Sequence, residues 1–403
     1  MKNAIGSLPF YVVAITCTLG GLDARALDFG LVKPPTASRG HQDATLKGFA
    51  GARLGESLEV RHRVQHADAT SGIAPVWAQS ERALKRSGLL PVRLCGDTGS
   101  AVNEIADVPK PITSFGAAIV GDQVYAYGGH FGNAHEYSTE GQSSELIQLN
   151  LKKPEQWNVV SRGPKLQGLA MVTDGEKLYR LGGFTAKNQP GDEHDLWSQA
   201  QVASFDLESQ KWSELPNLPE PRSSFDAVIL DHVIYVVGGW QMAGEADTTW
   251  HETAWSLDLS STPLKWKPLA NPPFKRRAVS AAAFEGKVYV MGGMQERGGP
   301  TTSVAIYDPK KNTWSEGPSM PGEAMEGFGT AAFAQGGRLF VSTYGGLLLR
   351  LSKDGKSWEK AQQLETARFF HRMLPVGKQQ MIFFGGASME IGKFEHVDLI
   401  EVQ

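Results

Sequence analysis

Short apolar runs that end in a pair of glycines recur along most of the chain. They begin at Val124, Leu178, Ile234, Val288 and Ile382, and the first glycines of successive pairs lie 54, 56, 54 and 93 residues apart. The long gap holds a sixth run at Leu339, where Ser342 and Thr343 replace the glycines. Because the runs are continuously apolar, they predict strands that are buried on both faces of a sheet.

A second apolar run and then a tryptophan follow each of the first five glycine-pair positions. The tryptophans are Trp157, Trp212, Trp266, Trp314 and Trp358. This order predicts a third strand and an outer fourth strand in each unit. A large aromatic side chain suits the outer strand, because neighbouring sheets diverge with distance from a common axis.

A four-strand unit of about 50 residues with these glycines and this tryptophan resembles the kelch repeat. The resemblance covers roughly 300 of the 403 residues. It implies an all-β fold, a six-bladed kelch β-propeller of four-stranded blades.

The last unit, residues 366–403, ends after its third strand. Its missing outer strand is predicted at the other end of the repeats. The segment from Val102 to Phe115 aligns with that from Trp212 to Phe225 at a constant offset of 110 residues. We therefore expect residues 101–106 to close the ring as an N-terminal strand, within a propeller domain at 101–403.

The first 26 residues have the pattern of a signal peptide. Lys2 precedes an apolar stretch, and Ala24-Arg25-Ala26 fits a cleavage site. The alternative is a membrane anchor, but the uninterrupted apolar core at Phe10–Leu19 is shorter than the roughly 20 residues that span a bilayer. We expect a secreted or periplasmic bacterial protein without stable membrane insertion after cleavage. Only Cys17 and Cys95 occur in the chain, so the mature protein could form no internal disulfide.

Residues 27–100 carry ten basic and seven acidic side chains and show no sustained period. They predict a flexible, mostly disordered basic arm, with a short helix at Trp77–Lys85 as an option. A solvated linker is favoured over docking on an anionic surface. The chain's net charge of −3 gives no support to a nucleic-acid partner, and a monomer is expected.

Arginines gather in the loops that enter the innermost strands, where a propeller has its channel mouth. These are Arg222, Arg276, Arg277, Arg368 and Arg372. Guanidinium groups there could bind a carboxylate, sulfate or phosphate. The structural alternative is that they bond neighbouring carbonyls or the acids Asp226 and Glu326.

The loops after the first three glycine pairs are long and rich in aromatic residues. They contain His130, Trp197, Trp240 and Trp250, which suit sugar faces or peptide side chains. The run Asp192-Glu193-His194-Asp195 has ligand types for a cation, but turn chemistry explains it equally well. We predict a glycan or protein/peptide ligand, no cofactor and no metal.

The kelch superfamily also contains two enzyme types that the sequence can be compared with. A copper galactose oxidase needs a Cys–Tyr pair, and no cysteine lies in the repeats. A sialic acid mutarotase needs an acid and a base in the channel, for which Glu326 and His371 are the candidates. The family's glutamate after a blade's second strand is missing, because Phe184, Trp240, Met294 and Tyr344 occupy the corresponding positions. A recognition or scaffolding propeller is therefore favoured, and a sugar mutarotase or epimerase is the alternative.

Overall fold

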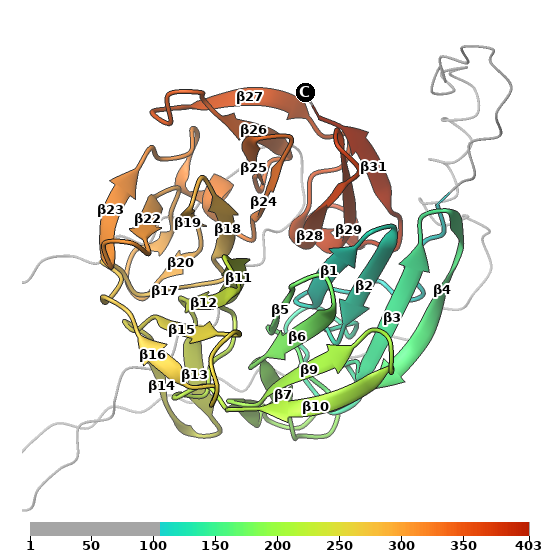
Figure 1. Ribbon diagram of the computed structural model, residues 1–403. Coiled ribbons are helices and arrows are strands. Elements are labelled where there is room, and N and C mark those ends of the chain that lie inside the picture. Colours follow the sequence, from blue (N-terminus) through green and yellow to red (C-terminus); the bar gives the residue numbers. More distant parts are fainter. Residues whose placement is uncertain (1–104, 403) are drawn as a thin grey trace, which may run out of the picture. The chain divides into compact units, whose positions relative to one another are not determined.

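The computed structural model describes residues 105–402, which fold almost entirely into β-strands. The only helix in this range is one 3-10 turn, η1 (Ala324–Gly327). Figure 1 shows antiparallel sheets arranged around a central axis. The described part of the chain is therefore all-β and has the propeller architecture that the repeats predict.

Each main sheet is named here by its innermost strand. The β1 sheet contains β1 (Gly116–Val120), β2 (Gln123–Tyr127), β3 (Glu145–Asn150) and β4 (Lys153–Arg162). The β5 sheet contains β5 (Ala170–Thr173), β6 (Lys177–Leu181), β9 (Val202–Asp206) and β10 (Lys211–Leu215). The β11 sheet contains β11 (Asp226–Leu230), β12 (Val233–Val237), β15 (Trp255–Asp258) and β16 (Trp266–Pro268).

The second half of the chain repeats this plan. The β18 sheet contains β18 (Ser280–Phe284), β19 (Lys287–Met291), β22 (Val304–Asp308) and β23 (Thr313–Gly317). The β24 sheet contains β24 (Ala331–Gln335), β25 (Arg338–Ser342), β26 (Leu347–Leu351) and β27 (Trp358–Gln363). The β28 sheet contains β28 (Phe369–Val376), β29 (Gln380–Ser388), β30 (Gly392–Lys393) and β31 (Asp398–Glu401), with β30 and β31 both paired to β29.

Hydrogen bonds from the second glycine of each pair join neighbouring sheets. The Gly129 N–H donates to Leu166 O (2.8 Å), and the Gly183 N–H donates to Arg222 O (2.9 Å). The same link runs from the last sheet to the segment before the first strand, because the Gly386 N–H donates to Ile112 O (2.7 Å). The predicted glycine pairs therefore lie at contacts between sheets, where the backbones approach closely.

The repeated tryptophans form a second set of links. The indole N–H of Trp266 donates to Pro216 O (2.8 Å), that of Trp314 to Ala270 O (2.7 Å) and that of Trp358 to Pro318 O (2.8 Å). In each case the acceptor belongs to the segment that follows the preceding sheet. The tryptophans thus lie between sheets, as the sequence predicts.

The hydrophobic core lies between neighbouring sheets. One cluster joins Leu181 of the β5 sheet to Ile234 of the β11 sheet, and another joins Leu149 of the β1 sheet to Phe384 of the β28 sheet. All four side chains are fully buried. Burial of one such side chain contributes about 1.5–3 kcal/mol, so this stacking stabilises the fold.

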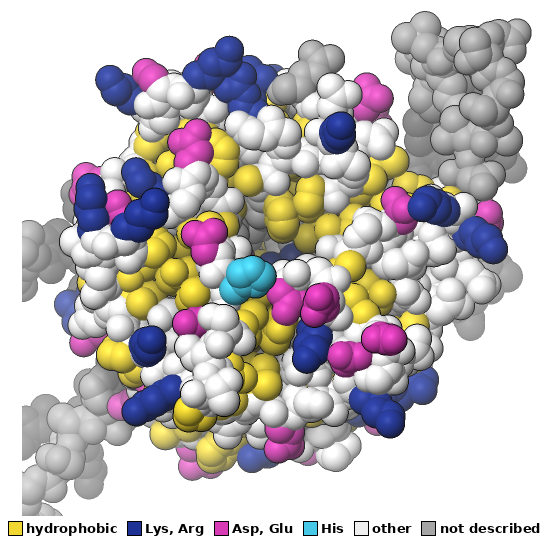
Figure 2. Space-filling model, in the orientation of Figure 1, with side chains coloured by type: hydrophobic (Ala, Val, Ile, Leu, Met, Phe, Trp, Pro, Cys, Tyr) yellow, Lys and Arg dark blue, Asp and Glu magenta, His cyan; other side chains and the backbone are white. Residues whose placement is uncertain are grey.

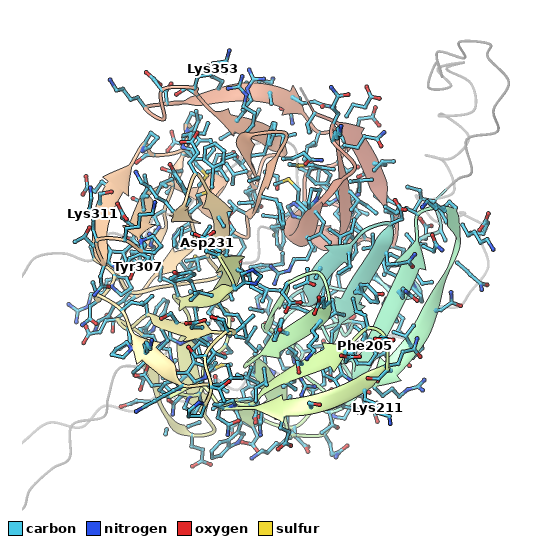
Figure 3. The ribbon with its side chains drawn as sticks, in the orientation of Figure 1. Phe205, Lys211, Asp231, Tyr307, Lys311 and Lys353 are labelled. Carbon is cyan, nitrogen blue, oxygen red and sulfur yellow. The ribbon has the colours of Figure 1, made fainter. Side chains whose placement is uncertain are left out.

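The sheets present two faces. An innermost strand begins at the end of the sheet where the next strand reaches its glycine pair, as the pairing of Gly116 with Tyr127 shows. We call this end the loop face and the opposite end the turn face. Among turn-face residues, Asp231 lies near the axis, and Lys211, Lys311 and Lys353 lie toward the rim (Figure 3). In the same view, Lys and Arg side chains lie mostly around the rim, and hydrophobic side chains, acidic side chains and a histidine lie nearer the centre (Figure 2).

The predicted signal peptide (1–26) and basic arm (27–100) lie outside the described residues, as do residues 101–104 of the predicted closing strand. Ile105 and Ala106 are described and form no strand. The Ala106 N–H donates to Pro154 O (2.7 Å) of β4, and the Val108 N–H donates to Glu395 O (2.7 Å) before β31. Across residues 105–402, no helix has the length and apolar character needed to cross a membrane.

Candidate functional site

The long loops of the second and third repeats form an additional sheet on the loop face. Its strands are β7 (Phe184–Ala186), β8 (Leu196–Ser198), β13 (Trp240–Ala243) and β14 (Ala246–Trp250), in the order β14-β13-β8-β7. The pairing of Ala243 with Trp197 joins the two repeats. A small three-stranded sheet is formed by segments further along the chain: β17 (Arg276–Arg277), β20 (Met294–Gln295) and β21 (Gly299–Pro300).

The loop of the first repeat is tied to this additional sheet. The side chain of Asn188 donates to Tyr137 O (2.7 Å), and the side chain of Gln142 donates to Ala186 O (2.7 Å). The Tyr137 ring packs against Phe184 at 5.7 Å and against His194 at 5.4 Å between centroids. Three loops that are far apart in sequence therefore form one surface.

Arg277 meets the aromatic side chains of this surface. Its guanidinium carbon lies 4.1 Å from the ring centroid of Trp240 and 5.7 Å from that of Trp250. The two indoles pack edge to face at 5.4 Å. Burial lowers the pKa of Arg277, and the nearby Tyr137 opposes this effect. The structure thus brings together residues that the sequence assigns to two separate sets of loops.

Arg222 and Arg368 have structural partners. Arg222 is fully buried and donates to Gly238 O (2.7 Å), Thr253 O (3.1 Å) and the Glu220 carboxylate (3.0 Å). Arg368 donates to Gly385 O (3.2 Å) and His396 O (3.1 Å) and pairs with Asp398. Each side chain bonds the carbonyl of the first glycine of its own sheet's pair. These two arginines therefore bond carbonyls and acids of the protein, as the structural alternative expects, but their acid partners are Glu220 and Asp398 instead of Asp226 and Glu326.

Arg372 extends from β28 to three other sheets. Its side chain donates to Phe115 O (2.8 Å), Leu169 O (3.3 Å) and the Asp226 carboxylate (3.4 Å). These acceptors lie at the starts of β1, β5 and β11. The guanidinium therefore bridges the innermost strands close to the axis.

Backbone hydrogen bonds also join the segments that precede neighbouring innermost strands. The N–H groups of Gly168, Ser224 and Ala278 donate to Ser114 O (2.6 Å), Gly168 O (2.8 Å) and Ser224 O (2.6 Å), respectively. The equivalent Phe370 N–H donates to Gly329 O (2.9 Å), with a φ of 55°. These residues share a left-handed conformation. A bulky residue rarely adopts it, so no sequence signal predicts it at Phe370.

Glu326 and His371 make no hydrogen bond or ion pair with each other. The Glu326 carboxylate accepts from the Gly345 N–H (3.0 Å). His371 is buried, and its Nε2 lies 2.7 Å from the Ser342 hydroxyl, which is also fully buried. Burial, together with the charges of Arg368 and Arg372, lowers the pKa of His371 to about 3. This imidazole is therefore neutral and shielded from solvent at neutral pH.

His130 is buried, whereas Trp197 is accessible. His130 Nε2 lies 3.2 Å from Glu136 O, and its Nδ1 lies 3.0 Å from the Lys393 ammonium group. Trp197 is 36% exposed, with the Lys187 ammonium group 4.0 Å from its ring centroid and its indole N–H bonded to Asp195. Within residues 105–402, no group of three or more His, Cys, Asp or Glu side chains could hold a metal ion.

Comparisons with known proteins agree with the repeat pattern. A family model described as the KLHDC2/KLHL20/DRC7 Kelch-repeats domain matches residues 168–386, more than half of the chain. Kelch-like protein terF of Aspergillus terreus is 25% identical over 226 residues, which are 54% of this chain and 47% of that protein. Kelch-like protein 23 of Homo sapiens is 24% identical over 286 residues, which are 66% of this chain and 44% of that protein. The chain thus spans less than half the length of these relatives.

A solved structure titled "Structure of YjhT" has a similar fold. The match has a TM-score of 0.60 at 16% sequence identity, and it covers 74% of this chain and 97% of that chain. At this identity, the similarity concerns the fold alone.

Proposed function

This chain belongs to the kelch-repeat family, and on that premise we propose that it is a recognition or scaffolding module for a glycan or peptide ligand. The proposal assigns no bond-making chemistry to the chain. The observation that carries it is the additional sheet β14-β13-β8-β7, which joins the loops of two repeats on the loop face. Long loops without a role are uncommon, and a ligand-binding surface explains why these loops are ordered against one another.

The composition of this surface supports recognition. It combines the accessible Trp197, the edge-to-face pair Trp240 and Trp250, and Arg277. Aromatic and arginine side chains dominate the binding energy of many interfaces, because they offer large rigid contact areas together with hydrogen-bond donors. The kelch relatives are named as kelch-like proteins, and kelch propellers commonly bind other proteins, so a peptide segment is a suitable ligand class.

The alternative, a sugar mutarotase acting in the channel, has less support. An acid–base pair must reach one substrate, whereas His371 is buried against Ser342 and Glu326 is bonded to a different loop. Arg372 also occupies the region near the axis where such a substrate would bind.

We further propose that the sheets form six blades and that residues 101–106 close the ring. The offset of 110 residues aligns Ala106 with Pro216. Pro216 O accepts from the Trp266 indole N–H, and Ala106 O accepts from the Trp157 indole N–H (3.1 Å). Ala106 therefore makes the same type of contact as Pro216, which directly follows the outer strand β10: its carbonyl accepts from the tryptophan of the next sheet. This equivalence supports the predicted closure.

The remaining parts of the proposal concern the segments before the propeller. We propose that residues 1–26 direct export to the periplasm or outside the cell, that residues 27–100 form a flexible arm, and that the mature chain is a monomer. The signal pattern of Lys2 and Ala24-Arg25-Ala26 supports export.

The proposal is tested by binding assays with the exported protein. We expect peptide or glycan arrays to give ligands whose binding is weakened by Trp197→Ala on the loop face. Lys311→Ala on the turn face is the matched control and should have no effect. One-dimensional NMR of sialic acid and common aldoses tests the alternative. If the protein accelerates anomer exchange and Glu326→Gln abolishes that acceleration, mutarotation becomes the favoured function and the recognition proposal is wrong.

A further inference from the structure

Phe370 is the one bulky residue in a set of six equivalent positions on the loop face. Each repeat has a residue with φ between 52° and 61° at or just before the start of its innermost strand. The other five residues have small side chains or none: Ser114, Gly168, Ser224, Ala278 and Gly329. A bulky residue with positive φ is an outlier, and such backbone strain is concentrated at functional sites. Phe370 therefore indicates a role for its ring that outweighs the strain.

Phe370 belongs to a group of four aromatic rings at the loop-face ends of the β24 and β28 sheets. Its ring centroid lies 4.9 Å from that of Phe328 and 5.3 Å from that of Phe369. Tyr344 stacks on Phe369 at 5.5 Å, with an angle of 14° between the ring planes. Phe328 is buried, whereas the other three side chains are half-buried and partly reach solvent. These accessible rings offer negative π faces on an otherwise apolar patch.

A carboxylate without a cationic partner lies beside this aromatic patch. Glu326 is half-buried, and its Oε2 accepts from the N–H of Gly345, the residue after Tyr344. Burial raises the pKa of the Tyr344 hydroxyl, and the nearby charge of Glu326 raises it further. Among residues 105–402, no Lys, Arg or His forms an ion pair with Glu326. Its negative charge is therefore left uncompensated next to the Tyr344 ring.

The equivalent place two repeats earlier contains a cation. Trp240 and Tyr344 each directly follow the glycine-pair position of their repeats, and Arg277 and Phe369 each directly precede the residue with positive φ. Arg277 covers Trp240 at 4.1 Å, whereas Phe369 covers Tyr344. In the part of the chain that the structure describes, no cation lies over Tyr344, Phe369 or Phe370. The aromatic faces and the Glu326 charge are thus available for a cation of the ligand.

We propose that Tyr344, Phe369, Phe370 and Glu326 bind an alkylammonium group of a peptide ligand. The rings attract the ammonium group through their π faces, and the Glu326 carboxylate accepts its charged hydrogen bond. This inference rests on the recognition function proposed above and adds the charge that the ligand must carry. The ammonium group belongs to a lysine side chain or to the amino end of the peptide, which present the same chemistry to the site.

The test uses the exported protein and a displayed library of random hexapeptides. The library is selected on the parent protein and counter-selected on Glu326→Gln, so that ligands of other surfaces are removed. Binders that survive are synthesised in three forms: unchanged, with lysine acetylated, and with the amino end acetylated. We expect one acetylated form to lose at least about tenfold in affinity, measured by calorimetry. The form that loses affinity identifies the source of the ammonium group.

Variants of the protein complete the test. Glu326→Gln keeps an acceptor for the Gly345 N–H and should lose at least about tenfold for the ammonium peptide and nothing for its acetylated form. Tyr344→Leu should lose about threefold, because it removes one π face. Glu323→Gln, on the exposed residue before η1, is the matched control and should bind as the parent protein does.

Three results would overturn the inference. They are equal affinity of Glu326→Gln and the parent, equal losses in Glu326→Gln and Glu323→Gln, and a counter-selection that leaves no binder although the plain selection yields some. Equal losses in the two glutamate variants would show that only long-range attraction is involved.

The two proposals fail in different ways. If Trp197→Ala weakens a peptide that Glu326→Gln and acetylation leave unchanged, the ammonium inference is wrong and recognition on the loop face stands. If neither peptides nor glycans bind the parent protein, the recognition function fails and the inference fails with it.

Discussion

The guanidinium of Arg372 lies 3.4 Å from the carboxylate of Asp226, although 146 residues separate them in the chain. The same guanidinium bonds Phe115 O and Leu169 O, and the other carboxylate oxygen of Asp226 accepts from the Ala281 N–H (2.9 Å). Two side chains thus connect β28 with the starts of β1, β5 and β11 and with β18. Burial raises the pKa of Asp226, and the charge of Arg372 opposes this effect. This network therefore ties the innermost strands of five sheets together.

Removal of Arg372 should destabilise the propeller. Arg372→Met leaves the carboxylate of Asp226 without its cation and two carbonyls without a donor. We expect a loss of about 2–4 kcal/mol in the free energy of unfolding, measured by urea denaturation. The double variant Arg372→Met/Asp226→Asn should lose less than the sum of the single variants, because the two residues interact. Additive losses would show that the contact contributes nothing.

The glycine pairs should be intolerant of a methyl group where another sheet lies close. At Gly239, with a φ of 88°, an added Cβ would lie 2.6 Å from Ser223 O and 2.7 Å from the Phe225 Cβ. Gly175, with a φ of 98°, has no atom within 4 Å of that position. Both alanine variants incur the cost of the backbone conformation, about 1–2 kcal/mol. We expect the free energy of unfolding, measured by heat or urea, to fall by at least about 1 kcal/mol more in Gly239→Ala than in Gly175→Ala, because only the added Cβ at Gly239 overlaps neighbouring atoms. Equal losses would contradict this account.

Substitutions of the adjacent residues Arg276 and Arg277 should differ in their effect on stability. Arg276 donates to Gly292 O and Ser303 O, both at 2.8 Å, so Arg276→Met should cost about 2–3 kcal/mol of stability. Arg277→Met should lower the free energy of unfolding by less, since the half-buried Arg277 makes no hydrogen bond with residues 105–402 and loses only its contacts with the rings of Trp240 and Trp250. Urea denaturation of the two variants at neutral pH provides the comparison. A larger stability loss for Arg277→Met than for Arg276→Met would contradict these roles.

Three buried histidines should make the protein less stable in mild acid. Burial is the main cause that lowers the pKa of His130 and His251 to about 4 and that of His371 to about 3. The unfolded chain, with a histidine pKa of about 6.5, binds more protons in this range. The stability contributed by the neutral imidazoles is therefore complete above about pH 6.5 and declines as the pH falls toward the folded-state values.

Unfolding experiments between pH 7 and pH 5 check this expectation. Each histidine should contribute a decline of up to about 1.4 kcal/mol per pH unit. His371→Gln should show a shallower dependence than the parent protein, whereas His232→Gln, on the exposed turn after β11, should retain the parent slope. A His371→Gln variant that keeps the full slope would exclude His371 as a source.

Progressive shortening from the N-terminus tests the proposed closure. A chain that begins at Ala101 should keep the melting temperature of the mature protein, because the arm at 27–100 is proposed to lie outside the propeller. A chain that begins at Asp107 lacks the carbonyl that binds the Trp157 indole and should melt several degrees lower. Equal melting temperatures for the two chains would argue against closure by residues 101–106.

Local sequence was sufficient to predict the strands of each repeat. The runs at Val124, Leu178, Ile234 and Val288 are buried strands in the structure, and the tryptophans Trp212, Trp266, Trp314 and Trp358 lie between sheets. Such features are readable because each unit repeats the same short-range requirement: an apolar strand, a backbone turn without a side chain, and a wide aromatic filler. The loop arginines were harder to assign. Arg276 and Arg277 are adjacent in the same loop, yet Arg276 bonds the carbonyls of Gly292 and Ser303, whereas Arg277 packs against the rings of Trp240 and Trp250.

The sequence by itself determined the repeat, its strand order and the places where loops are long. Only the tertiary structure decided which loop residues meet: Arg277 with Trp240, Tyr137 with Phe184, and Arg372 with Asp226. The physical reason is that a strand pattern depends on neighbours within a few residues, whereas a guanidinium's partner depends on side chains that arrive from other repeats. The arrangement of the sheets around an axis brings those repeats together, and the spacing of residues along the chain does not predict the resulting distances between side chains.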